Sequence, residues 1–296
     1  MICAVSHKPI VHQYIDDVLS GEIVACKLVK AACERHLRDL NRQNTDEFQF
    51  YFDENEANDV CSFFPLALRH SKGAKFAGNP LDLQPWQVFI MWVLFGWKRC
   101  DDETRRFRRA HISVARKNGK STIAAGIGLY GLTCDCEPGA EVYVSATKKD
   151  QAKCVFEEAE RMRESSPRLK ALVSNHVNNL FVKQSNSFFR PTSSDKPLDG
   201  PNPHFTIFDE LHAWREVHRK FYNTMITGGG SRTQPMQLTI TTAGDDQSFI
   251  WLEEYALCSS VVRGELTDET IFVYVAEIDD DDDPLDERVW IKANPN

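Results

Sequence analysis

One stretch, residues 115–122, constrains the fold of this chain more than any other, because its sequence ARKNGKST ends like a phosphate-binding loop. Gly119 allows a tight turn in which successive backbone N–H groups point at phosphate oxygens. Lys120 offers a mobile positive charge to the β- and γ-phosphates, and Ser121 offers a hydroxyl that can ligate Mg²⁺. The full motif has a Gly where this chain has Val114, so the loop departs from the pattern at one position.

The residues on either side of the loop fit the same interpretation. Residues 111–114 (HISV) alternate and are β-prone, which predicts a strand running into the loop. Residues 121–130 are mostly small and apolar, which predicts a helix packed against a sheet. The N-terminus of that helix would direct its positive dipole end at the bound anion.

A second candidate site follows the apolar, β-branched run at residues 205–208, which predicts a buried parallel strand. Asp209 and Glu210 come directly after it, at the carboxyl edge where open α/β sheets bind ligands. We expect Asp209 to hold Mg²⁺ through water and Glu210 to polarise the water that attacks the γ-phosphate. The structural alternative is an ordinary strand followed by a helix with an acidic first turn.

A third strand is predicted over residues 236–240, and it closes with Thr241, Thr242 and Gly244. Hydroxyl groups at the end of a strand can contact the γ-phosphate and move when it leaves. The alternative is a Thr- and Gly-rich turn with no ligand.

Taken together, these three segments resemble the large terminase subunit of tailed bacteriophages, the ATPase motor that packs DNA into the capsid. In this resemblance the loop at 115–121 corresponds to the Walker A motif, and residues 207–213 (IFDELHA) correspond to the Walker B motif. The segment LQPWQ at 83–87 resembles the adenine-recognition segment of the same family, which implies that Gln87 reads adenine. The similarity runs from about residue 81 to the chain end, with a weaker likeness over 12–40. The family tolerates a residue other than Gly where Val114 stands.

The resemblance implies a set of roles and partners. Arg116 would contact the phosphates in cis, and the Thr-rich segment would couple hydrolysis to movement. The implied catalytic residues are Glu210, Lys120 and Arg116, and the implied Mg²⁺ ligands are Ser121 and Asp209. The implied ATP-binding residues are Gln87, Asn118, Gly119, Lys120, Ser121, Thr122, Thr241 and Thr242. Implied partners are double-stranded DNA, a portal protein, a small terminase subunit and further copies of the chain in a ring. An arginine from a neighbouring copy would complete the site, with Arg190, Arg215, Arg219 and Arg232 as candidates.

The order of predicted strands and helices indicates an α/β fold: a mostly parallel P-loop NTPase sheet of the ASCE/RecA-like class, with helices on both faces. We expect a mostly helical N-terminal segment at 1–78, an ATPase domain at 79–276 and an acidic linker at 277–296. Further predicted helices cover 10–42, with a break near Gly21, then 56–69, 83–97, 150–164, 216–226 and 248–263. Further strands are predicted over 48–52, 141–146, 177–182 and 271–276. Residues 191–203 are predicted as a loop, and Gly228–Gly230 as a flexible joint.

Composition narrows the class of protein further. The chain has 296 residues, 42% hydrophobic, with no run long enough to span a membrane. Its nine cysteines are scattered, and the one close pair, Cys134 and Cys136, lacks two further ligands nearby for a metal. Reduced thiols in the host cytoplasm are therefore expected.

The net charge of −8 hides two local clusters. Residues 98–120 hold nine lysines and arginines against three acids, among them Arg105, Arg106, Arg108 and Arg109. This cluster indicates either contact with phosphates of DNA or nucleotide, or a solvated strand edge. Residues 279–283 are five consecutive aspartates, which we interpret as a solvated linker. They are a poor metal cage, because consecutive residues on an extended chain point in opposite directions.

The terminase family normally continues into an RNase H-like nuclease domain, and no carboxylate cluster here supplies one. We therefore expect no DNA cleavage by these 296 residues. On this interpretation the polypeptide is either a fragment of a longer protein or a truncated gene product. Two rival functions stay open. One is a helicase or translocase of another class, which should carry a second motor domain. The other is a nucleotide-binding assembly module without hydrolysis, suggested by the loss of the first loop Gly.

Overall fold

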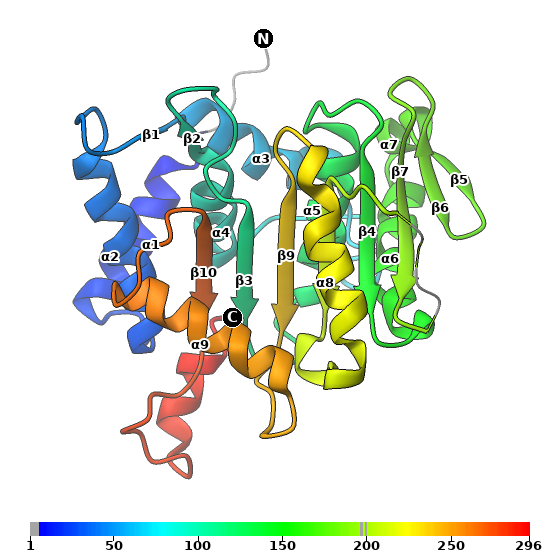
Figure 1. Ribbon diagram of the computed structural model, residues 1–296. Coiled ribbons are helices and arrows are strands. Elements are labelled where there is room, and N and C mark those ends of the chain that lie inside the picture. The colour runs from blue at the N-terminus through cyan, green and yellow to red at the C-terminus, as the bar shows by residue number, and fades with distance from the viewer. Residues whose placement is uncertain (1–5, 196–197, 199) are drawn as a thin grey trace. The chain divides into compact units, whose positions relative to one another are not determined.

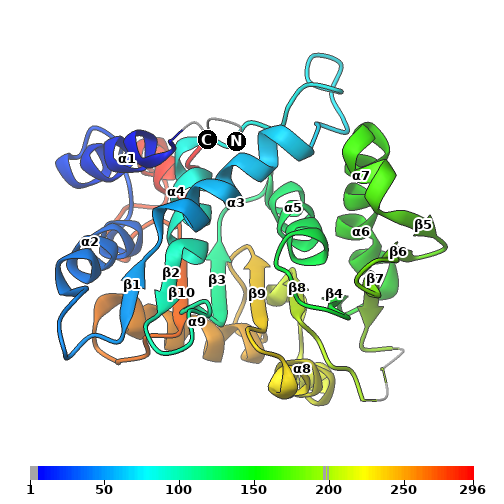
Figure 2. The same ribbon diagram turned by 90° about the horizontal axis from the view of Figure 1, so that it is seen from above.

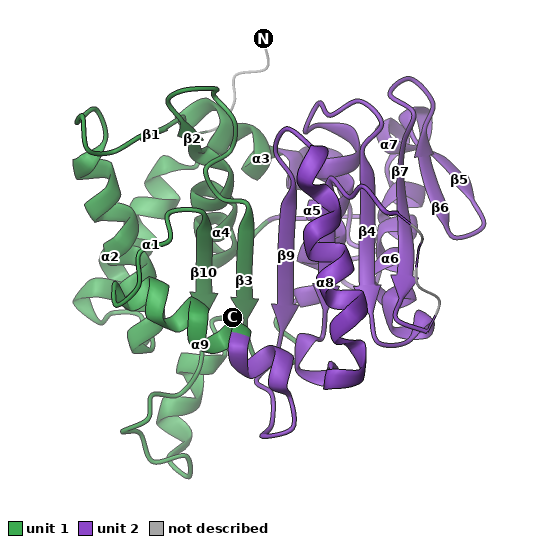
Figure 3. Ribbon diagram, in the orientation of Figure 1, with its two compact units in different colours: residues 1–62, 83–118, 254–296 green, residues 63–82, 119–253 purple. Residues whose placement is uncertain are grey.

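The computed structural model describes residues 6–195, 198 and 200–296, and it divides by packing into two units (Figure 3). Unit 1 holds the chain up to Ser62 together with Leu83–Asn118 and Glu254–Asn296. Unit 2 holds Phe63–Asp82 and Gly119–Glu253. Figure 1 labels most of the helices and strands of the two units.

Unit 1 begins with helices, as predicted. Helix α1 (Lys8–Ser20) ends at Gly21, whose φ of 89° is left-handed, so the predicted break at this glycine is confirmed. Helix α2 (Lys27–Arg42) follows, and then strand β1 (Phe50–Phe52), which pairs antiparallel with β2 (Trp97–Arg99). Between them in the chain lie α3 (Glu54–Ala67), which contributes to both units, and α4 (Pro85–Gly96). Helix α4 is buried from Trp86 to Gly96, so its tryptophans are core residues.

Two parallel strands and the helices on their two faces complete the core of unit 1. Strand β3 (Arg109–Ser113) pairs with β10 (Ile271–Val275) so that Ile112 lies opposite Tyr274. Tyr274 stacks on Trp86 of α4, with ring centroids 5.7 Å apart. His111 points to the other face, where its ring lies within reach of α9 (Phe249–Arg263). Figure 2 accordingly shows α4 and α9 on opposite sides of these strands.

Unit 2 is built on a mostly parallel sheet. Its strand order is β9-β8-β4-β7-β6-β5, in which β9, β8, β4 and β7 are parallel and the outer β6 and β5 are antiparallel. The bounds are β4 Glu141–Ala146, β5 Ser174–His176, β6 Asn179–Val182, β7 Ser187–Ser193, β8 Phe205–Asp209 and β9 Met236–Thr241. The helices are α5 Lys120–Thr133, α6 Lys149–Ser165, α7 Pro167–Leu172 and α8 Arg219–Thr227.

Side chains of β8 alternate between two helical layers. Phe205 lies against α5, where a Cβ added to Gly131 would come within 2.6 Å of the Phe205 ring. Phe208 points the other way and packs on Tyr222 of α8, with ring centroids 4.7 Å apart. Figure 2 shows α5, α6 and α7 on one face of this sheet and α8 on the other. The predicted α/β class, with helices on both faces of a mostly parallel sheet, is therefore confirmed.

One local prediction was wrong at its start. Residues up to Ser193, expected in a loop from 191, belong to β7, and Pro191 pairs with Val144 of β4. Proline is tolerated there because the last β7 residue paired with β6 is Phe189. Residues 196, 197 and 199 of the same predicted loop lie outside the described residues. The expected joint at Gly228–Gly230 is a 3-10 turn, and a Cβ at Gly228 would lie 2.6 Å from the Pro201 carbonyl oxygen.

Short 3-10 turns also follow β8, at Leu211–Ala213 and Glu216–His218, and another covers Glu287–Ala293. Among the described helices, each is too short or too polar to cross a bilayer.

Candidate nucleotide-binding site

The loop between β3 and α5 makes its turn at two residues with left-handed backbone. Lys117 has a φ of 68° and Gly119 a φ of 75°. Val114, where the motif pattern has Gly, is not among the described residues with positive φ, and its side chain is buried. The departure from the pattern at Val114 therefore imposes no backbone strain, because the sharp turn falls three residues later.

Helix α5 begins immediately after the loop, with Gly119 at its N-cap and no side-chain cap on its first N–H groups. Uncapped N–H groups at a helix N-terminus are donors suited to an anion. Lys120 is 7% exposed, and Ser121 and Thr122 are half-buried in the same first turn. The predicted phosphate-binding residues of unit 2 thus lie together at one helix end.

The Asn118 side chain holds the loop together within unit 1. Its Nδ2 donates to the Ala115 carbonyl and to Asn294 Oδ1, each at 3.1 Å. The Ala115 N–H in turn donates to the Ala293 carbonyl at 3.2 Å. The chain end at 293–294 is therefore hydrogen-bonded to the phosphate-binding loop, which the sequence did not predict. Because its amide is engaged in this way, Asn118 would offer a nucleotide its backbone.

Arg116 and Gln87 also belong to unit 1. Arg116 is exposed. Gln87 is 9% exposed, and its Oε1 accepts from the Gln84 N–H at 3.0 Å, which caps α4. A hollow of about 280 Å³ lies beside this segment, with Pro85, Trp86 and Tyr274 among its lining residues. The amide oxygen of Gln87 has a structural role as a helix cap, and the Trp86 and Tyr274 side chains are themselves 1% and 0% exposed.

Asp209 and Lys120 come together in unit 2, at the carboxyl end of β8. Asp209 is 4% exposed, and its Oδ1 has no hydrogen-bond partner. Burial and the neighbouring Glu210 carboxylate raise the pKa of Asp209 to about 7, and the Lys120 ammonium acts in the opposite direction. A buried carboxylate oxygen without a donor, close to a buried lysine, fits a cation or a metal-bound water.

Glu210 is held by both backbone and side chain. Its φ of 51° is left-handed, a strained conformation for a residue other than Gly, and its N–H donates to the Ile240 carbonyl at 3.0 Å. Its Oε2 lies 3.0 Å from His212 Nδ1. His212 Nδ1 is also 3.2 Å from the hydroxyl oxygens of both Thr241 and Thr242. One imidazole therefore links two of the predicted site segments, and sequence reasoning assigned it no role.

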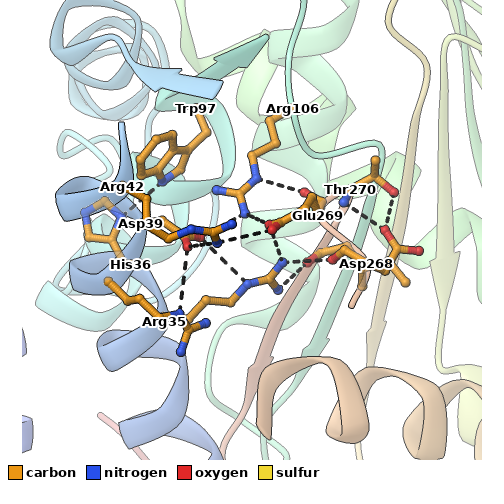
Figure 4. Close-up of polar contacts among 11 residues, drawn as sticks. Arg35, His36, Asp39, Arg42, Trp97, Arg106, Asp268, Glu269 and Thr270 are labelled. Carbon is orange, nitrogen blue, oxygen red and sulfur yellow. Dashed lines mark hydrogen bonds and ion pairs between the residues drawn. The ribbon is translucent and has the colours of Figure 1, made fainter. Parts of the chain in front are cut away.

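Arg106 belongs to the basic cluster ahead of β3, and neither of the two predicted roles fits it. It is buried, so it can neither contact the phosphates of a ligand nor form a solvated strand edge. This side chain is fully buried, and its Nη2 donates to Asp39 Oδ2 at 2.8 Å and to the Glu269 carboxylate. Its Nε donates to the Glu269 carbonyl at 2.8 Å (Figure 4). Arg35 joins the network through the carboxylates of Glu269 at 3.7 Å and Asp39 at 3.9 Å, and it also donates to the Ile271 carbonyl at 2.7 Å. These are internal ion pairs of unit 1, in a ring of aromatic side chains: Phe48, Phe50, Trp97 and Phe107.

The acidic run is also less solvated than predicted. Lys292 Nζ donates to Asp279 at 2.8 Å and to Asp282 at 2.7 Å, and the two carboxylates are 8% and 14% exposed. Lys27 donates through its N–H to Asp279 and through its Nζ to Asp281. Residues 279–282 therefore bind the last 3-10 turn to the start of α2.

Parallel strands with polar residues at their carboxyl ends, next to an uncapped helix and its glycine turn, define an α/β domain with a candidate ligand-binding edge. A family model described as "Terminase large subunit, ATPase domain" matches residues 85–259, and the chain belongs to this family. A second model, "Terminase large subunit, endonuclease domain", matches residues 265–296. Part of that second match, Ile271–Val275, is strand β10.

Similar proteins agree with this assignment. The large terminase subunit of Enterobacteria phage HK97 is 27% identical over 230 residues, which cover 75% of this chain and 42% of that protein. Protein YmfN of Escherichia coli K12 is 34% identical over 98 residues, covering 33% of this chain and 21% of that protein. The crystal structure of the HK97 large terminase has the same fold, with a TM-score of 0.67 at 24% identity, over 81% of this chain and 47% of that one. The chain thus spans less than half the length of these relatives.

Proposed function

We propose that this chain binds ATP with Mg²⁺ and hydrolyses it as the motor part of a terminase large subunit, moving double-stranded DNA into a viral procapsid. The observation that carries the proposal is the meeting of Lys120 with Asp209, next to Glu210, at one end of the parallel sheet of unit 2. A lysine for phosphate and two carboxylates for metal and water are the groups that phosphoryl transfer requires.

The phosphates would be held by the first turn of α5. The N–H groups of Gly119, Lys120, Ser121 and Thr122 would donate to phosphate oxygens, and Lys120 and Arg116 would neutralise their charge. Ser121 and Asp209 would hold Mg²⁺, which fits the unpartnered Oδ1 of Asp209. When bound, the ion neutralises charge on the β- and γ-phosphates. Gln87 would contact the adenine, as the family resemblance implies.

Glu210 would accept a proton from the attacking water, and its strained backbone fixes where its carboxylate stands. Thr241 and Thr242 would sense the γ-phosphate, and their hydroxyls contact the same histidine as Glu210 does. Loss of the γ-phosphate would then be transmitted from the threonines to the catalytic carboxylate and onward to the parts that hold DNA.

Assembly would follow that of the family, with a portal protein, a small terminase subunit and a ring of copies in the host cytoplasm. Among the four candidates for an arginine donated to a neighbouring copy, Arg232 is disfavoured, because it is 9% exposed and bonded to Glu137 and to the Gly139 carbonyl. Arg190, Arg215 and Arg219 remain. We propose that residues 79–276 form the ATPase domain, preceded by the helical segment 1–78 and followed by the linker 277–296.

The test is ATP turnover of the wild type against Glu210→Gln, with and without DNA. We expect turnover to fall by about 10²–10⁴-fold, the usual worth of a general base, while nucleotide affinity is kept. Lys120→Ala should lose affinity as well. If basal turnover is low, the assay is repeated with portal and procapsid present. Turnover of the Gln variant equal to the wild type would remove Glu210 from the chemistry. Nucleotide binding without turnover in any arm would favour the non-hydrolysing module.

A further inference from the structure

Three side chains with metal-binding atoms converge in the interior of unit 1. His111 comes from β3, and Glu254 and Cys258 come from α9. The two helix residues are four apart, which places them on one face of the helix, one above the other. One ligand atom from each of the three lies within 4.8 Å of the others. All three are buried: His111 and Cys258 are 0% exposed and Glu254 is 2% exposed.

His111 gives independent evidence for a ligand at this place. Both of its ring nitrogens, Nδ1 and Nε2, are buried without a hydrogen-bond partner. A neutral imidazole has one N–H donor and one nitrogen with a free lone pair. Buried polar atoms are nearly always paired in proteins, because leaving one unpaired is costly. A metal ion on the free nitrogen would satisfy it.

The spacing of the other two ligands fits tetrahedral coordination. Cys258 Sγ lies 3.7 Å from Glu254 Oε1. With the usual zinc–sulfur and zinc–oxygen bond lengths, two ligands of a tetrahedral zinc are about 3.6 Å apart. Arg109 donates to the same carboxylate, with Nε 2.8 Å from Oε1, so it would orient the ligand from outside the first coordination sphere.

We propose that His111, Glu254 and Cys258 form a structural site for a divalent transition metal of the zinc class. The combination of imidazole, thiolate and carboxylate favours such ions over Mg²⁺ or Ca²⁺, which prefer oxygen alone. Binding would release the thiol proton, so that the charges of thiolate and carboxylate balance the ion. Three protein ligands leave one tetrahedral position for water. The ion would fix α9 to β3, the strand that leads into the phosphate-binding loop.

The experiment measures bound metal in the full chain. The wild type, Cys258→Ala and Cys33→Ala are produced with zinc in the medium, dialysed against metal-free buffer and analysed by mass spectrometry of their metal content. Cys33 is the matched control, because it is equally buried in unit 1 but lies on α2. We expect one zinc per chain in the wild type and in Cys33→Ala, and at least a tenfold loss in Cys258→Ala.

Cobalt substitution gives a second readout, and it can be made on the wild-type chain even if a variant fails to fold. Cobalt bound through Cys258 in the wild type should show a thiolate-to-cobalt charge-transfer band, and added zinc should abolish it. His111→Gln should weaken cobalt binding, by about 10-fold or more, as is common for altered metal shells. A wild type without the band, or with no more zinc than Cys258→Ala, would overturn the proposal. These readouts are independent of ATP turnover, so they do not depend on the proposed function.

Discussion

Glu210 and His212 face each other at the end of β8, with 3.0 Å between Oε2 and Nδ1. The same imidazole reaches the hydroxyls of Thr241 and Thr242, which follow the neighbouring strand β9. If Glu210 activates water, His212 is a positioning residue that holds it in line with the threonines.

We therefore expect His212→Ala to lower the ATPase kcat by about 10-fold or more, since misplaced catalytic groups lose much of their effect. Nucleotide affinity should change little, because His212 does not belong to the phosphate-binding turn. His212→Gln, which restores a hydrogen-bonding group, should recover part of the rate. His176→Ala, on the exposed strand β5, is the control and should match the wild type. A loss of affinity equal to the loss of kcat would contradict a positioning role.

Asp209 makes stability depend on pH. Its pKa rises from 3.8 in the unfolded chain to about 7 in the folded one, so the folded chain keeps a proton that the unfolded chain loses between these values. The free energy of unfolding should therefore fall as the pH rises from about 4 to about 7. Asp209→Asn, measured by urea unfolding without Mg²⁺ or nucleotide, should be more stable than the wild type at pH 8. The gain is a few kcal/mol, at about 1.4 kcal/mol per pKa unit.

Asp245 provides the control of opposite sign. Arg215 lowers the pKa of this exposed carboxyl, so its charged form stabilises the fold above the unfolded pKa, and that contribution is lost as the pH falls. Asp245→Asn should thus reduce stability near neutral pH. A variant at Asp209 that is less stable than the wild type at pH 8 would show that its charge is not destabilising.

Arg106 should be among the most sensitive positions of unit 1. Replacement by Ala leaves the Asp39 carboxylate, which is 2% exposed, without its nearest partner at 2.8 Å. Breaking a buried ion pair on one side typically costs about 3–5 kcal/mol, which we expect in the free energy of unfolding. Arg99→Ala breaks an exposed pair with Asp101 and should cost about 1 kcal/mol or less. Equal effects in the two variants would mean that the network contributes no more than a surface pair.

The hydrogen bond from Asn118 to Asn294 predicts that the chain end influences nucleotide binding. Asn294→Ala removes one acceptor of the amide that orders the loop, worth about 0.5–1.5 kcal/mol. We expect ATP affinity, measured by calorimetry, to weaken by about 2- to 10-fold, with the fold intact. Arg288→Ala changes an 89% exposed side chain of the same 3-10 turn and should leave affinity unchanged. An unaltered ATP affinity in Asn294→Ala would show that Asn294 does not influence nucleotide binding through the loop.

The strands and helices that carry the candidate site could be read from the sequence, because each is specified by local patterns. The buried run before Asp209 and the small residues after Lys120 correspond to β8 and α5 in the structure. Element ends shifted by a few residues, and no strand was predicted at β7, whose last residues, 191–193, were expected in a loop. The absence of Gly at Val114 suggested a defect in the loop. Only the backbone angles show that the turn falls at Lys117 and Gly119 instead.

What the sequence alone determined is the order of strand, loop and helix, and the polar residues at the strand ends, since both depend on neighbours in the chain. Side-chain partners were decided by the tertiary structure. Arg106 meets Asp39 and Glu269, and His111 meets Cys258, across separations of more than 60 residues. No periodicity records such pairs, because they exist only once distant segments have packed and excluded water from the charges between them.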